Sequence, residues 1–186
     1  MRSFIAVNLP DAVKSDLDEI ANRLRPEGPA ARWVPAANVH ITLKFLDEID
    51  ADQVEPLTQA IAKAARETEP FEIRLGGFGV FPNPRRARVF WVGIESGVEI
   101  LKGLAHVIDH QANKLGFPRE KRAFSAHLTL ARLRQPGPVD QLLEAAAEIP
   151  YRSVPIPVSR IDLMRSVLAP GGAQYSVLDS VTLKET

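Results

Sequence analysis

The chain has 186 residues, with 23 basic and 23 acidic side chains, four histidines and no cysteine. This length suits one domain with its own hydrophobic core, and the lack of cysteine excludes disulfides and thiolate-bound zinc. Zero net charge excludes a wholly basic nucleic-acid coat, and no apolar run approaches the roughly 18 residues of a membrane span.

The N-terminal half alternates strands and helices. A helix opens at Pro10 and places apolar residues on one face, and a second helix follows Asp50, which suits an N-cap. Gly76-Gly77 indicates a bulge. We predict strands over residues 2–8, 32–34, 39–46 and 71–81, and a loop over 25–30.

The C-terminal half repeats this mixture. We predict strands over residues 88–94, 124–133, 154–168 and 174–183, and helices over 98–115, ended by Gly116, and over 139–148. The last two strands flank a Pro170-Gly171-Gly172 turn and suit a hairpin. Hairpin connections favour an α+β fold with antiparallel sheets over a doubly wound parallel sheet.

The tetrapeptide His-x-Thr-Leu occurs twice, beginning at His40 and at His127. The two histidines lie 87 positions apart, close to half the chain length. This spacing predicts one domain over residues 1–186, with two related lobes about a pseudo-twofold axis and no linker between them.

Each motif falls on a predicted strand, where residues i and i+2 face the same side. His40 therefore points with Thr42, and His127 with Thr129, while the intervening apolar residues point into packing. If the two strands meet at the pseudo-dyad, two imidazoles and two hydroxyls line one cleft. The alternative, that each histidine is an ordinary polar strand residue, does not explain the matching contexts.

Histidine titrates near neutral pH, so one imidazole can deprotonate water while the other protonates a leaving oxygen. Threonine hydroxyls can hold the non-bridging oxygens of a phosphate as charge develops on them. This chemistry needs no metal or other cofactor, and no carboxylate cluster has ligand-like spacing. His106 and His110 form an i, i+4 pair, but they lack the glutamate of a His-Glu-x-x-His site.

Arginines cluster over residues 85–88, 119–122 and 132–134. Arginine suits bidentate phosphate contacts, and one of these clusters adjoins the second motif. Solvated loop charge explains any single cluster, but three together favour a local phosphate-binding face.

The extended motifs, His40–Leu46 and Phe124–Arg132, resemble the two-histidine phosphoesterases and, within them, the RNA 2′,3′-cyclic phosphodiesterases, historically called 2′-5′ RNA ligases. The resemblance covers nearly the whole chain. Further similar segments are Arg2–Ala6, Phe81–Arg85, Leu115–Pro118, Leu163–Ser166 and Tyr175.

The resemblance implies a bilobal pseudo-twofold α+β fold, with two mainly antiparallel sheets facing a central cleft and helices packed outside. It implies metal-free opening of an RNA 2′,3′-cyclic phosphate, or of a small cyclic nucleotide, to a 2′-phosphate. His40 would be the proton donor and His127 the proton acceptor, although the residues alone do not decide this assignment. Phe45 and Arg132 would contact the base and the phosphate.

Two positions depart from the family pattern: Asp47 replaces a usual glycine, and Ala126 replaces a common proline. The positions of Phe45 and Arg132 do not fit a regular strand, because position i+5 faces away from position i. Phe45 and Arg132 therefore reach the cleft only if each strand ends, twists or bulges before them.

Two other functions fit the same motifs. Reversal of the reaction would make the chain a 2′-5′ RNA ligase, and loss of turnover would leave a module that binds nucleotides or RNA ends. We expect a cytoplasmic monomer without a leader, a membrane anchor or an obligate protein partner.

Overall fold

The computed structural model describes residues 1–28, 30–170 and 172–184. The helices are α1 (Asp11–Leu24), α2 (Val54–Ala65), α3 (Val98–Lys114) and α4 (Asp140–Ala147). The strands are β1 (Arg2–Asn8), β2 (Ala31–Trp33), β3 (His40–Glu48), β4 (Phe71–Phe81), β5 (Ala87–Ser96), β6 (His127–Gly137), β7 (Ile156–Val158), β8 (Arg160–Ala169) and β9 (Gly172–Thr182). Residue 29 of the predicted loop and Gly171 of the predicted turn lie outside the described residues.

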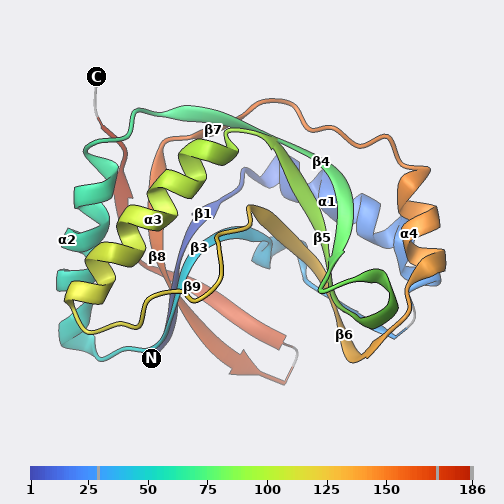
Figure 1. Cartoon of the computed structure of the whole chain (residues 1–186), viewed down its shortest axis with the longest axis horizontal. Coiled ribbons are helices and arrows are strands. Elements are labelled where there is room, and N and C mark those ends of the chain that lie inside the picture. Colours follow the sequence, from blue (N-terminus) through green and yellow to red (C-terminus); the bar gives the residue numbers. More distant parts are fainter. Residues whose placement is uncertain (29, 171, 185–186) are drawn as a thin grey trace.

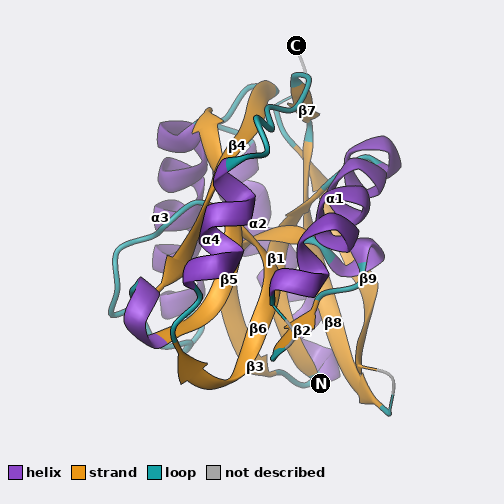
Figure 2. Ribbon diagram, turned by 90° about the vertical axis from the view of Figure 1, so that its right-hand side faces the viewer, coloured by secondary structure: helices purple, strands orange, loops and turns teal. Residues whose placement is uncertain are grey.

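The strands form two sheets, and every neighbouring pair is antiparallel. One sheet has the order β3-β1-β8-β9 and the other β2-β6-β5-β4-β7. Helices α2 and α3 lie beside the first sheet, and α1 and α4 beside the second, so that helices flank the strands on two sides (Figures 1 and 2). This arrangement confirms the predicted α+β class with antiparallel sheets and outer helices.

The order of elements repeats along the chain. The run β1-α1-β3-α2-β4 has the same pattern as β5-α3-β6-α4-β8, with β2, β7 and β9 added at the sheet edges. The third strand of each run crosses to the other sheet: β4 pairs with β5, and β8 pairs with β1. The two halves are therefore joined by exchanged strands, which brings the two motif strands to equivalent positions beside β1 and β5.

The apolar residues of the two motifs lie in the core. Ile41, Leu43, Leu128 and Leu130 are all buried, as the strand alternation predicts. Each anchors its motif strand in the interior, because these residues belong to the main hydrophobic cluster. The opposite face of each strand is thereby left for the histidines and threonines.

Some predicted boundaries are wrong. The predicted strand over residues 154–168 is two strands, β7 and β8, that pair with different sheets and are separated at Ser159. The predicted strand over 124–133 begins only at His127 and continues to Gly137. A 3₁₀ turn over Ala51–Gln53 precedes α2, and the Gln53 side chain accepts a hydrogen bond of 2.9 Å from the Asp50 N–H.

Within the described residues, no helix has the length and apolar character needed to cross a membrane.

Candidate active site

The two motif strands meet although they belong to different sheets. β3 and β6 are in contact, and the charge of His127 acts on the titration of His40. The strands that carry the two predicted histidines therefore lie close together in the fold.

Both imidazoles are held in the same way. Nδ1 of His40 lies 2.7 Å from the carbonyl oxygen of Asn38, and Nδ1 of His127 lies 2.7 Å from that of Ser125. A carbonyl oxygen can only accept, so each Nδ1 carries the hydrogen, and this assignment follows from the hydrogen-bond partner. Each Nε2 is left as the nitrogen that can take or give a proton.

The hydroxyl partners differ between the motifs. Oγ1 of Thr42 lies 3.0 Å from Nε2 of His40, so the hydroxyl donates to the neutral imidazole. Thr129 has no hydrogen bond to His127 among the described residues. Both threonines are half-buried on the face of their histidines. The first motif thus has an internal hydrogen bond between its threonine and its histidine, whereas no such bond to Nε2 is present in the second motif.

A strand bulge follows each threonine and allows position i+5 to face the same side of the sheet as the histidine. On β3, the pairing with β1 passes from Thr42 to Lys44 between successive β1 residues, so Leu43 has no partner. Both Leu43 and Lys44 are buried, and Phe45 returns to the exposed face. Phe45 pairs with Phe4, with ring centroids 6.4 Å apart, on the side of His40.

The second motif repeats this bulge. On β6, the pairing with β5 passes from Thr129 to Ala131, and Leu130 has no partner. Leu130 and Ala131 are buried, while Arg132 is exposed. The charge of Arg132 lowers the pKa of both His40 and His127. The structure therefore brings position i+5 of each motif to the face of its histidine.

Aromatic rings line the imidazoles. Phe4 stacks on His40 at 4.6 Å between ring centroids, and Tyr175 meets His40 edge-on at 5.3 Å. Phe81 meets His127 edge-on at 4.9 Å, with Trp91 at 6.5 Å. None of these rings was predicted from the sequence as part of the site.

Phe4, Phe81 and Tyr175 occur in the segments quoted for the family resemblance, which was a signal for them. Trp91 could be found only from strand register, because it lies opposite Thr129.

Burial dominates the titration of the site. It lowers the pKa of His40 to about 4, against an opposing hydrogen bond to Asn38, and the charges of Lys14, Arg132 and His127 lower it further. Burial also lowers the pKa of His127, while the bond to Ser125 raises it. Both imidazoles are therefore neutral near pH 7, and the Nε2 lone pair of His40 accepts the hydrogen bond from Thr42.

A buried ion pair links the first motif to the segment before the second. Nζ of Lys44, almost fully buried, lies 2.7 Å from Oδ1 of Asp109 on α3 and donates to the carbonyl of Pro118 at 2.9 Å. Arg119 also pairs with Asp109. Burial raises the pKa of Asp109, but these partners together with the N–H of Glu120 bring it below its usual range.

The structure places Asp47 in an unusual backbone conformation. Its φ is 56°, the only positive value among the described non-glycine residues. Glycine adopts this region without strain, which explains why a glycine is usual here. Asp47 is exposed and lies after the motif, so the departure changes the local backbone energy and adds no group beside the imidazoles.

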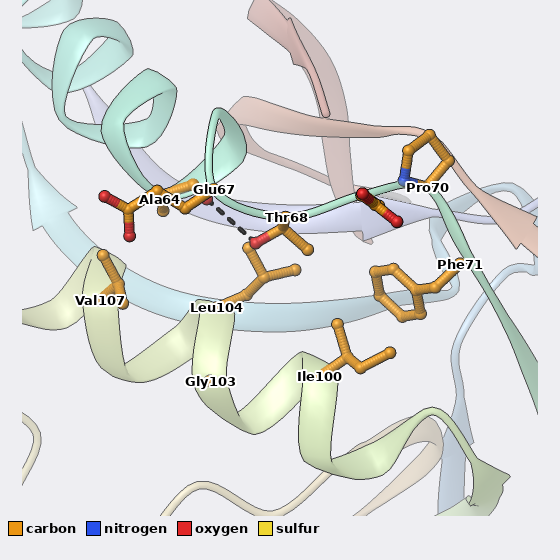
Figure 3. A pocket seen from close by; sticks show the side chains of 10 residues that line it. Ala64, Glu67, Thr68, Pro70, Phe71, Ile100, Gly103, Leu104 and Val107 are labelled. Atoms are coloured by element: carbon orange, nitrogen blue, oxygen red, sulfur yellow. Dashed lines mark hydrogen bonds between the residues drawn. The ribbon is translucent and has the colours of Figure 1, made fainter. Parts of the chain in front are cut away.

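A separate cavity of about 550 Å³ lies between α2 and α3 (Figure 3). Its lining is mainly apolar, including Phe71, Ile100 and Leu104, and its titratable side chains are Glu67 and Glu69. It contains neither motif. Over residues 1–28, 30–170 and 172–184, no three or more His, Asp or Glu side chains are grouped as metal ligands. His106 and His110 are exposed on α3.

Known proteins share both the sequence and the fold. A family model described as LigT like Phosphoesterase matches the chain twice in succession, over residues 7–91 and 92–175. A Methanothermobacter thermautotrophicus protein named RNA 2′,3′-cyclic phosphodiesterase is 33% identical over 180 residues, which is 96% of this chain and 97% of its own length. A Thermotoga maritima protein of the same name is 31% identical over 179 residues, 96% and 93% of the two chains.

Solved structures agree. A crystal structure of a Thermus thermophilus protein matches with a TM-score of 0.80 and 30% identity, covering 99% of this chain and 98% of that one. A crystal structure of E. coli LigT complexed with 3′-AMP matches with a TM-score of 0.76 and 26% identity over the same shares. The tandem family match agrees with the repeated order of elements.

Proposed function

This chain belongs to the LigT-like phosphoesterase family, and we propose that it opens RNA 2′,3′-cyclic phosphate ends to a 2′-phosphate by acid–base catalysis between His40 and His127. One observation carries the proposal: two imidazoles on contacting strands, each with Nδ1 bound to a carbonyl oxygen two residues earlier, keep Nε2 as the nitrogen that can exchange a proton. The relatives named RNA 2′,3′-cyclic phosphodiesterase support the reaction class.

In the proposed reaction, Nε2 of His127 accepts a proton from a water molecule as its oxygen attacks phosphorus. The bond from phosphorus to the 3′ oxygen breaks, and that oxygen takes the proton from Nε2 of His40. The 2′ ester remains, and the product carries a 2′-phosphate and a 3′-hydroxyl. His127 then loses its proton to solvent, and His40 takes up a proton again when the next cyclic phosphate binds.

The threonines would stabilise the pentavalent transition state. The Thr42 hydroxyl, whose Oγ1 lies 3.0 Å from Nε2 of His40, can turn toward a non-bridging oxygen when that nitrogen is protonated. Thr129 takes the equivalent place in the second motif. Arg132 would balance the negative charge, and exposed Phe45 would stack on the terminal base.

The low pKa of His40 sets a condition on this mechanism. At a pKa of about 4, the imidazole is neutral at pH 7 without substrate, and Nε2 has no proton to give. A bound cyclic phosphate carries a negative charge, which favours the imidazolium and raises the pKa of His40. In the proposed mechanism, substrate binding therefore leads to protonation of Nε2 of His40, the proton donor.

Hydrolysis of a short RNA with a 2′,3′-cyclic end, in EDTA and with the product identified, tests the proposal. Wild type should release only the 2′-phosphate, and His40→Ala and His127→Ala should retain the fold but lose turnover by at least about 100-fold. His106→Ala, which changes an exposed histidine on α3, is the matched control. Near wild-type turnover in either site variant would refute the mechanism.

The same assay separates the two alternatives. Supplying RNA with a 5′-hydroxyl beside the cyclic end would reveal ligation as a joined product. End binding without turnover across about pH 5 to 9 would instead favour a binding module.

A further inference from the structure

Arg32 lies next to Arg132 although the two are 100 positions apart in the sequence. It is the middle residue of β2, the short edge strand beside β6, and it is directly opposite Arg132 in the register. Directly opposed residues of an antiparallel pair point to the same side of the sheet. Because Arg132 is on the face of His127, Arg32 is on that face too, one strand farther from the imidazoles.

The guanidinium of Arg32 reaches the other sheet. A Cβ built on Gly172, at the start of β9, would lie 3.1 Å from a terminal nitrogen of Arg32. The neighbouring Ala173 accepts a hydrogen bond of 2.6 Å from the side chain of Asn38, which also holds His40 through its own carbonyl. Arg32 therefore lies where the start of β9 meets the segment before the first motif.

Neither arginine is neutralised within the part of the chain that the structure describes. No described carboxylate pairs with Arg32 or Arg132, whereas Arg119, Arg152 and Arg160 all have acidic partners. Two like charges directly opposite on a sheet are unfavourable. Exposed neighbouring guanidiniums suit an anionic ligand with more than one phosphate, since each can bind oxygens in a bidentate fashion.

We propose that Arg32 binds the phosphodiester immediately upstream of the cyclic end, and so makes the enzyme prefer RNA strands to cyclic mononucleotides. This inference rests on the proposed function, which places the cyclic phosphate between His40 and His127. Arg132 binds the reacting phosphate, and Arg32, which lies on the adjacent β-strand, binds the phosphodiester upstream of it. The RNA upstream of the cyclic end would pass between β2 and the β8–β9 hairpin.

Two substrates that differ by one phosphodiester test the subsite: a 2′,3′-cyclic mononucleotide and a dinucleotide with a 2′,3′-cyclic end. Arg32→Gln should lower kcat/KM for the dinucleotide about tenfold, the size of one charge-assisted hydrogen bond, and leave the mononucleotide within about twofold of wild type. The dinucleotide reaction of Arg32→Gln should also depend less on salt concentration than that of wild type, because one charged contact is lost.

Arg66→Gln removes an exposed charge at the end of α2 and should change neither substrate. Equal losses on both substrates with Arg32→Gln would place Arg32 at the reacting phosphate and overturn the subsite. No loss on either would overturn it as well.

If wild type turned over neither substrate, the proposed function would fail, and equilibrium binding would then decide the subsite. Calorimetry with a nucleoside 3′-phosphate and with a dinucleotide 3′-phosphate supplies this second readout. A selective tenfold loss for the dinucleotide would support the Arg32 contact, and equal affinities in wild type and variant would refute it.

Discussion

Acidification should destabilise the fold through His40. The ordinary pKa of 6.5 applies to the unfolded chain, and burial lowers the folded value to about 4. Between these values the unfolded chain binds a proton that the folded chain does not, so the free energy of unfolding rises with pH through this window. The difference amounts to about 2.5 kcal/mol of stability that is present at about pH 7.5 and lost by about pH 4.5.

Two other groups with shifted pKa values affect how much of the stability change over this pH range can be assigned to His40. The pKa of His127 is also lowered, so this residue contributes in the same direction and a part of the loss remains when His40 is replaced. The lowered pKa of Asp109 acts below its ordinary value of 3.8, because a depressed carboxyl loses its stabilising effect only as pH falls through that range. The window above about pH 4 therefore reports chiefly on the two histidines.

Urea denaturation of wild type and His40→Gln across this pH range is the assay, with equal m-values as the check on two-state unfolding. The stability of His40→Gln should fall by about 2.5 kcal/mol less than that of wild type between the two pH limits. His106→Gln, on the exposed face of α3, should follow wild type.

A difference below about 1 kcal/mol would contradict this prediction, because it would mean that the folded and unfolded pKa values nearly coincide. An NMR titration of His40 measures the pKa of the folded state directly. A midpoint near the ordinary 6.5 would show that burial does not control this imidazole.

Three further predictions concern catalysis and the motif flanks. If the bound phosphate charges His40, the alkaline limb of the kcat profile should lie at higher pH than that of kcat/KM, and coincident limbs would contradict this. Asp47→Gly should raise the free energy of unfolding by up to about 1 kcal/mol, since relief of a left-handed backbone outweighs the added chain entropy; a urea midpoint below wild type would exclude that. Phe45 is 57% exposed, so Phe45→Ala should change stability little. It should lower kcat/KM for cyclic-ended RNA about tenfold through lost stacking, and an unchanged kcat/KM would remove Phe45 from the base contact.

The two bulges show where strand alternation stops being sufficient. Alternation places His40 and Thr42 on one face of the strand and places Ile41 on the opposite face, in the core. It fails at Phe45, because Leu43 has no partner on β1 and shifts the following residues by one face. A bulge depends on how two strands align, and the partner strand lies far away in the sequence.

Local sequence patterns were enough to predict the motif pair, the mixture of helices and antiparallel strands, and the apolar residues that anchor each motif. A repeated tetrapeptide, a period of two or 3.6, and turn residues can be recognised without knowing which strands pair. For the same reason these patterns left the boundaries of β6, β7 and β8 imprecise, since those depend on pairing partners.

How these parts combine follows only from the tertiary structure. The motif strands β3 and β6 come into contact from different sheets, and the carbonyls of Asn38 and Ser125 fix the hydrogen on each Nδ1. Burial, which lowers both histidine pKa values, and the register that sets Arg32 opposite Arg132 are likewise properties of segments far apart in the chain. Such long-range contacts are set by the packing of the whole core, and no local pattern contains them.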